Sequence, residues 1–131
     1  MPQNLGRTLV RPAPVPAEGP VLTKAALRAS EGLGISNKSL ARIVGLSEAS
    51  VSRMGTGAYT LTPGDKSFEL AVMFVRLFRS LDALVHGDAA VARAWMANPN
   101  AALGGRPVEL IQTISGLTHV LAYLDARRAL V

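Results

Sequence analysis

The residues best suited to chemistry lie in one segment, NKSLARIVGLSEASVSRM, at positions 37–54. It holds hydroxyl, amide, carboxylate and guanidinium groups, which hydrogen-bond to a polar partner. Its small residues are regularly spaced, with Ala41 followed four positions later by Gly45 and ten positions later by Val51. Two short helices that cross steeply need a small residue at their contact, a residue that accepts positive φ at the reversal, and an apolar residue facing the corner. Because a serine also precedes each helix as a cap, the spacing predicts a helix-turn-helix.

This segment resembles the repressor-like Xre family of DNA-binding domains. The resemblance implies that the helix over residues 47–54 enters the major groove of double-stranded operator DNA, where side chains not used for packing read the bases. A carboxylate can accept from a cytosine amino group, an alanine can touch a thymine methyl group, and a guanidinium can reach guanine or a phosphate. The expected base readers are Glu48, Ala49, Ser52 and Arg53, and the expected phosphate contacts at helix N-termini are Asn37, Lys38 and Ser47.

Local structure offers a simpler explanation for two of these residues. Ser47 would cap its helix whether or not DNA is present, and Glu48 is favoured in a first turn by the helix dipole alone. Nothing local requires a cation at Arg53, which is therefore the strongest candidate. One such domain binds DNA weakly, so specific recognition requires a homodimer with half-sites about one DNA turn apart.

A second informative segment covers residues 95–124, WMANPNAALGGRPVELIQTISGLTHVLAYL. Trp95 and Met96 end a helix, the NPN sequence makes a turn, Pro107 opens another helix, and Gly116 separates that helix from the last one. The arrangement resembles the C-terminal toxin-binding domain of the Xre/MbcA/ParS antitoxins. The matching positions are Trp95, Pro99, Asn100, Leu103, Gly105, Arg106, Pro107, Leu110, Gly116, Val120 and Leu124.

This second resemblance implies a protein partner. Such antitoxins bind RES-domain toxins, which resemble ADP-ribosyltransferases and attack NAD, and the C-terminal part of the antitoxin covers the active site of the toxin. In this chain the covering element would be residues 123–131. The guanidinium groups of Arg127 and Arg128 would pair with groups lining the toxin pocket, although two arginines in a last helical turn also simply complement the dipole. The expected toxin contacts are Arg106, Tyr123, Arg127, Arg128, Leu130 and Val131.

An all-α fold must position these residues. Apolar periodicity and capping residues predict helices over 22–33, 36–45, 47–54, 65–85, 88–96, 108–113 and 116–130, and no useful period-2 strand pattern occurs. Five of the eight prolines fall in the first 20 residues, which predicts an extended arm over 1–20. The arm either has no role or docks on DNA or a partner. We expect a helix-turn-helix domain over 21–61 and a helical dimerisation and toxin-binding domain over 62–131.

The longest predicted helix is apolar over more than one face. The apolar stripe of this helix is so broad that the helix must be buried between layers of the fold or at a subunit contact. The helix is therefore either the dimer surface or part of the core. The stripe consists of Leu70, Phe74, Leu77, Leu81 and Leu84.

Charge and composition narrow the class of function. The first 60 residues hold seven basic and three acidic side chains, while the rest hold seven and six, so a polyanion would meet the first half. The chain has no cysteine and two histidines, and it shows no phosphate-binding glycine loop or metal motif. Ser115, His119 and Asp125 share one helix and cannot converge as a triad. We therefore expect a cytoplasmic non-enzyme without metal, cofactor or membrane segment. The alternative to an antitoxin is a stand-alone dimeric repressor.

Overall fold

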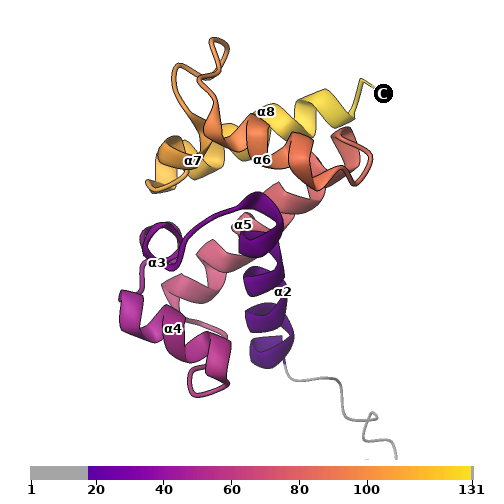
Figure 1. The fold of residues 1–131 in the computed structure, drawn as a ribbon. Coiled ribbons are helices and arrows are strands. Elements are labelled where there is room, and N and C mark those ends of the chain that lie inside the picture. The colour runs from indigo at the N-terminus through magenta and orange to yellow at the C-terminus, as the bar shows by residue number, and fades with distance from the viewer. Residues whose placement is uncertain (1–17, 131) are drawn as a thin grey trace, which may run out of the picture.

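The chain folds into packed helices. The computed structural model describes residues 18–130, and within that range it contains seven α-helices and no β-strand (Figure 1). The predicted all-α fold is therefore confirmed. In chain order the helices are α2 (Glu18–Leu33), α3 (Asn37–Val44), α4 (Glu48–Thr56), α5 (Lys66–Leu84), α6 (Ala89–Ala97), α7 (Pro107–Leu110) and α8 (Ile114–Arg128).

Polar side chains fix where four of the helices begin. Each cap residue accepts a hydrogen bond from a backbone N–H of the first turn, which has no partner within the helix. The donor–acceptor distances run from 3.0 to 3.2 Å. The cap residues are Ser36 for α3, Ser47 for α4, Asp88 for α6 and Thr113 for α8.

Two helices of the first half extend beyond their predicted bounds. The helix expected from Leu22 begins four residues earlier, at Glu18, because Pro20 falls in the first turn, where a missing N–H costs nothing. The helix expected to end before Gly55 continues to Thr56 and stops at Gly57, whose φ is +82°. Glycine at position 55 therefore did not end the helix, whereas the left-handed cap two residues later did.

The connection between α7 and α8 also differs from the prediction. The expected helix over 108–113 ends at Leu110, and the expected helix from Gly116 begins at Ile114. The reason lies at Gly116, where an added Cβ would overlap the carbonyl group of Leu110. Gly116 thus lies inside the first turn of α8 and allows the end of α7 to approach it closely.

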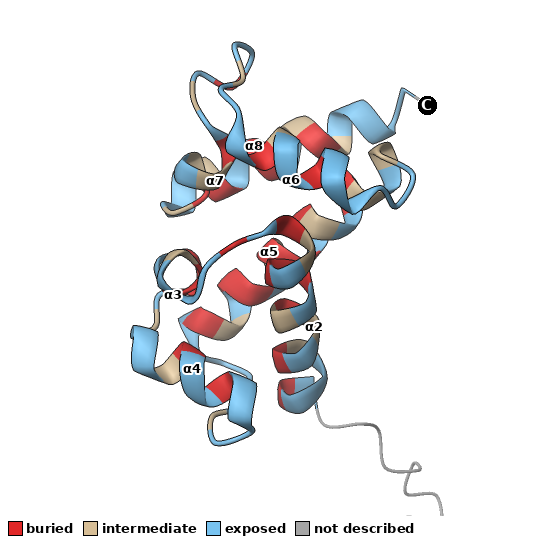
Figure 2. Ribbon diagram, in the orientation of Figure 1, coloured by how far each residue is buried: buried red, intermediate tan, exposed pale blue. Residues whose placement is uncertain are grey.

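Helix α5 lies at the centre of the fold, with α2 and α3 packed on it from one half of the chain and α8 from the other (Figure 1). Its predicted stripe is buried from Leu70 to Leu81, and Leu84 is half-buried (Figure 2). The chain itself covers this stripe, so core burial explains the broad apolar character of α5 without a subunit contact.

Two polar contacts join the halves away from α5. The Arg93 guanidinium on α6 donates a 3.0 Å hydrogen bond to the Glu31 carbonyl in the last turn of α2. The Gln112 amide, just after α7, contacts the Ser39 hydroxyl on α3 at 3.5 Å. A cation at a helix C-terminus also complements the helix dipole. The N-terminal helices and the C-terminal helices are therefore held together at several places.

Candidate functional sites

The corner between α3 and α4 is built from small and apolar residues, as the spacing predicts. Ala41 and Val51 are buried, at 6% and 1% exposure. Between them, Gly45 adopts φ +72° and its N–H bonds to the Ala41 carbonyl. The Leu46 N–H bonds to the same carbonyl at 2.9 Å. A side chain at Gly45 would be strained by this left-handed conformation, so the geometry depends on glycine.

Helix α4 presents one polar face to solvent. Val51 and Met54 face the core, and side chains on the opposite surface are all exposed. The predicted base readers occupy that surface: Glu48, Ala49, Ser52 and Arg53. Arg53 forms no ion pair with any side chain among residues 18–130, so its guanidinium is available to an outside acceptor.

The three expected phosphate contacts lie at the starts of α3 and α4. Asn37 and Lys38 are exposed in the first turn of α3. The Ser47 hydroxyl already accepts from the Ser50 N–H at 3.0 Å and also lies 3.0 Å from the Ser50 hydroxyl. Ser47 therefore caps α4 in the free chain, which is the simpler role given above. The N-termini of two helices and an exposed lysine make the surface at the starts of α3 and α4 electropositive.

A second cluster lies between α6 and α8. The rings of Trp95 and Tyr123 stack with centroids 6.5 Å apart. The Arg127 guanidinium lies over the Tyr123 ring, 5.7 Å from its centroid, and donates to the Tyr123 hydroxyl at 3.2 Å. These side chains border an open pocket of about 290 Å³ floored by Leu81 and Leu124. Trp95 is half-buried, so it contributes to both the core and this pocket.

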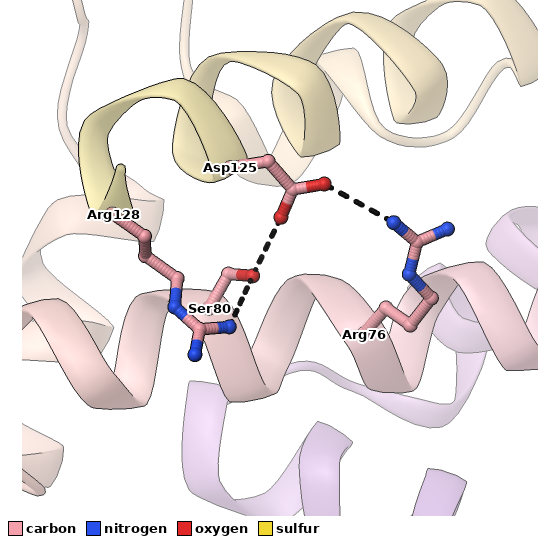
Figure 3. Close-up of polar contacts among 4 residues, drawn as sticks. All are labelled: Arg76, Ser80, Asp125 and Arg128. Carbon is pink, nitrogen blue, oxygen red and sulfur yellow. Dashed lines mark hydrogen bonds and ion pairs between the residues drawn. The ribbon is translucent and has the colours of Figure 1, made fainter. Parts of the chain in front are cut away.

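Arg127 and Arg128, expected to act together, lie in different surroundings. Arg128 turns toward α5, where its guanidinium donates to the Ser80 hydroxyl at 3.3 Å (Figure 3). The Ser80 hydroxyl donates to Asp125 at 2.9 Å, and Arg76 pairs with the other oxygen of that carboxylate at 3.1 Å. Arginine side chains on the surface of the C-terminal half thus occupy at least two separate patches.

The sequence reasoning missed Ser80 and Arg76. Ser80 is 2% exposed on a helix whose other buried positions are mainly apolar. A polar residue in an otherwise apolar stripe signals a buried partner, and this signal was present in the sequence.

The remaining expected toxin contacts lie at the surface or outside the described range. Arg106 is exposed immediately before α7, and Leu130 is 83% exposed after α8. Val131 lies outside residues 18–130. An apolar side chain as exposed as Leu130 has no packing role in this chain.

Comparison with protein families assigns both halves. The antitoxin Xre-like helix-turn-helix domain matches residues 15–76, and the antitoxin Xre/MbcA/ParS C-terminal toxin-binding domain matches residues 80–129. The chain belongs to the Xre/MbcA/ParS antitoxins. The family resemblance seen in the sequence is thereby confirmed, and the antitoxin carries a helix-turn-helix followed by a toxin-binding domain.

A curated relative matches a shorter part of this antitoxin. The antitoxin is 49% identical to the 6-hydroxy-3-succinoylpyridine 3-monooxygenase HspA of Pseudomonas putida (strain DSM 28022 / S16) over 43 residues, which make up 32% of the antitoxin. The matched stretch is 14% of the length of that protein. A match over so small a share of the relative is no evidence that the antitoxin has the activity of that relative.

Between Glu18 and Leu130, no helix has the length and apolar character needed to cross a bilayer. Over the same range, no three histidine or acidic side chains are grouped as metal ligands.

Proposed function

We propose that this antitoxin neutralises a RES-domain toxin, an NAD-attacking ADP-ribosyltransferase-like protein, by covering its active site, and that it binds its own promoter through the helix-turn-helix. The observation that carries the proposal is the pair of consecutive family matches. The two activities would belong to different parts of the chain. Residues 21–61 would bind DNA, and residues 62–131 would form the dimer and bind the toxin. Both activities would take place in the cytoplasm.

On operator DNA, the exposed face of α4 enters the major groove. Arg53 donates to guanine or to a phosphate, Glu48 accepts from a cytosine amino group, and Ala49 contacts a thymine methyl group. Ser52 hydrogen-bonds to a neighbouring base or phosphate. Phosphates bind at Asn37, Lys38 and Ser47, where the helix N-termini favour negative charge. All seven side chains are exposed, which supports this arrangement.

Four side chains on one short helix read few base pairs. The antitoxin therefore acts as a homodimer that places two α4 helices in successive major grooves, about 34 Å apart along the DNA.

On the toxin, the surface around Trp95, Tyr123 and Arg127 provides the main contact. Tryptophan, tyrosine and arginine are the residue types that most often dominate binding energy at protein interfaces. The pocket beside them can receive one apolar side chain of the toxin. Contacts from Arg106, Arg128, Leu130 and Val131 extend the interface toward the toxin active site.

Reciprocal substitutions of Arg53 and Arg127 test the two activities separately. Arg53→Ala weakens operator binding in a gel-shift titration by roughly 10- to 100-fold, equivalent to losing one base contact, and leaves toxin neutralisation intact. Arg127→Ala leaves operator binding intact and weakens rescue of cells that co-express the RES-domain toxin encoded beside the antitoxin gene. Each variant is the charge-matched control of the other.

Point variants are required because deleting residues 116–131 would remove buried core side chains, including Leu117, Val120 and Leu124. Loss of rescue by both variants, or by neither, would contradict the division of work. Operator binding without any rescue by the unaltered chain would instead support the stand-alone repressor.

A further inference from the structure

Gly55 is a glycine that the fold itself does not require. It lies in the last turn of α4 without a positive φ, and an added Cβ would have no heavy atom within 4 Å. Every other glycine between residues 18 and 130 either adopts a positive φ or has an atom close to the position of a Cβ. Because glycine lowers the stability of a helix relative to alanine, folding alone favours a side chain at position 55.

Gly55 continues the exposed face of α4 that holds the expected base readers. It follows Ser52 by three positions and Glu48 by seven, and residues at these spacings share one face of a helix. All three are exposed. Gly55 lies roughly 10 Å from Glu48 along the helix axis, at 1.5 Å per residue. A duplex that contacts the first turns of α4 therefore also passes its last turn.

The last turn of α4 would meet the border of the major groove. The N-terminal residues of a recognition helix contact the base edges, and the groove is only about 12 Å wide. The sugar–phosphate backbone of one strand therefore comes close to the C-terminal turn of the helix, where Gly55 lies.

A hollow beside Gly55 has the chemistry of a phosphate site. It has a volume of about 490 Å³ and lies between the last turn of α4 and the first half of α2. Lys24 on α2 and the hydroxyl-bearing Thr56, Tyr59 and Thr60 line it, and none of the described residues around it is acidic. Lys24 forms no ion pair among residues 18–130. Ammonium and hydroxyl groups are common donors to DNA phosphates.

We propose that this hollow receives a phosphate of the DNA strand that borders the groove read by α4, and that position 55 is glycine so that this strand can approach the helix closely. Lys24 donates to the phosphate. A side chain at position 55 would hold the strand away from α4, so the chain gives up helix stability for DNA affinity. This inference rests on the DNA binding of the proposed function and adds Gly55 and Lys24 to its contacts.

The position of the hollow favours DNA over the toxin as its occupant. It opens at the end of the helix that carries the expected base readers, and α4 packs mainly on α3 and α2. The surface proposed for the toxin, around Trp95, Tyr123 and Arg127, lies between α6 and α8. A phosphate in the hollow therefore belongs to the duplex that α4 contacts.

The first test is a gel-shift titration with duplex DNA from upstream of the antitoxin gene. Gly55→Ala weakens binding roughly tenfold and Gly55→Leu roughly 100-fold, because a larger side chain holds the strand farther away. Both variants melt at a higher temperature than the unaltered chain, since alanine and leucine are better helix formers. Weaker binding by a more stable protein cannot result from misfolding.

Thr118→Ala is the control for stabilisation alone. It places a better helix former at an exposed position of α8, and it leaves DNA binding unchanged.

The second test measures the salt dependence of the same titration. Lys24→Ala weakens binding roughly three- to tenfold and lowers the slope of log Kd against log salt concentration by about 1, because one fewer phosphate is neutralised. Lys24→Arg retains the affinity and the slope. Arg28→Ala is the matched control, since it removes the same charge one turn further along α2, where it does not line the hollow, and the slope stays the same.

Either test can overturn the proposal. Unchanged DNA affinity of Gly55→Leu would exclude the close approach, and an unchanged slope for Lys24→Ala would exclude the phosphate contact. Loss of toxin neutralisation by Gly55→Leu with intact DNA binding would assign the hollow to the toxin. Failure of the proposed function is distinguished by Arg53→Ala: if that variant weakens binding and the Gly55 and Lys24 variants do not, only this inference fails.

Discussion

The buried Ser80 hydroxyl on α5 donates a 2.9 Å hydrogen bond to the Asp125 carboxylate at the surface of α8 (Figure 3). It joins the two helices that pack most extensively on each other. Ser80 is 2% exposed, whereas the Arg76–Asp125 ion pair beside it joins side chains that are 57% and 41% exposed. Water and salt screen an exposed ion pair, so the hydrogen bond from the buried Ser80 hydroxyl contributes more to stability than the Arg76–Asp125 ion pair.

Replacing these residues one at a time separates the two contributions. Ser80→Ala lowers the free energy of unfolding by about 1 to 2 kcal/mol, because both Asp125 and Arg128 lose a partner. Arg76→Ala lowers it by less than about 1 kcal/mol. Urea denaturation of the two variants at low and high salt measures both values. A larger loss for Arg76→Ala than for Ser80→Ala would reverse this ranking.

Close contact between α7 and α8 makes Gly116 sensitive to any side chain. Gly116→Ala places a methyl group onto the Leu110 carbonyl and lowers stability by roughly 2 to 4 kcal/mol, since backbone must move. Gly55→Ala is the control, because Gly55 is helical with nothing within 4 Å of an added Cβ. Helix propensity makes that variant more stable by up to about 1 kcal/mol. Thermal melting distinguishes the two, and equal melting temperatures would refute the contact.

A buried hydroxyl holds the segment between α4 and α5 against α2. The Thr23 hydroxyl donates to the Gly19 carbonyl at 2.7 Å and accepts the Leu61 N–H at 2.9 Å. Thr23→Val keeps the shape but leaves the Leu61 N–H buried without an acceptor, which costs roughly 1 to 3 kcal/mol. Thr23→Ser retains the acceptor and loses only a methyl group, about 1 kcal/mol. Denaturant titration showing Thr23→Ser to be the less stable variant would contradict this role.

The corner between α3 and α4 could be predicted because its causes are local. Ala41, Gly45 and Val51 act within ten residues of one another, and Ser36 and Ser47 cap helices that follow directly. Local sequence carries this information since turn geometry and capping depend on neighbouring residues. The exposed face of α4 follows from the same periodicity, because burying Val51 and Met54 turns the intervening polar residues outward.

Contacts between distant residues could not be predicted in this way. Arg93 bonds to a carbonyl 62 positions earlier, and Ser80 bonds to a carboxylate 45 positions later. No spacing rule relates such pairs, because tertiary packing alone brings them together. Neighbouring residues on a helix point in directions about 100° apart, so Arg127 lies over Tyr123 of its own helix, whereas the position of α5 decides that Arg128 meets Ser80.

Helix α5 supplies one wall to the apolar interior of the helix-turn-helix half and another to that of the half that holds the toxin-binding domain. Unwinding α5 would expose the apolar core of both halves at once, because neither half has a separate core. Heat or denaturant should therefore produce one cooperative transition instead of two. A protease that gains access to α5 would therefore disrupt the helix-turn-helix domain and the toxin-binding domain in a single event.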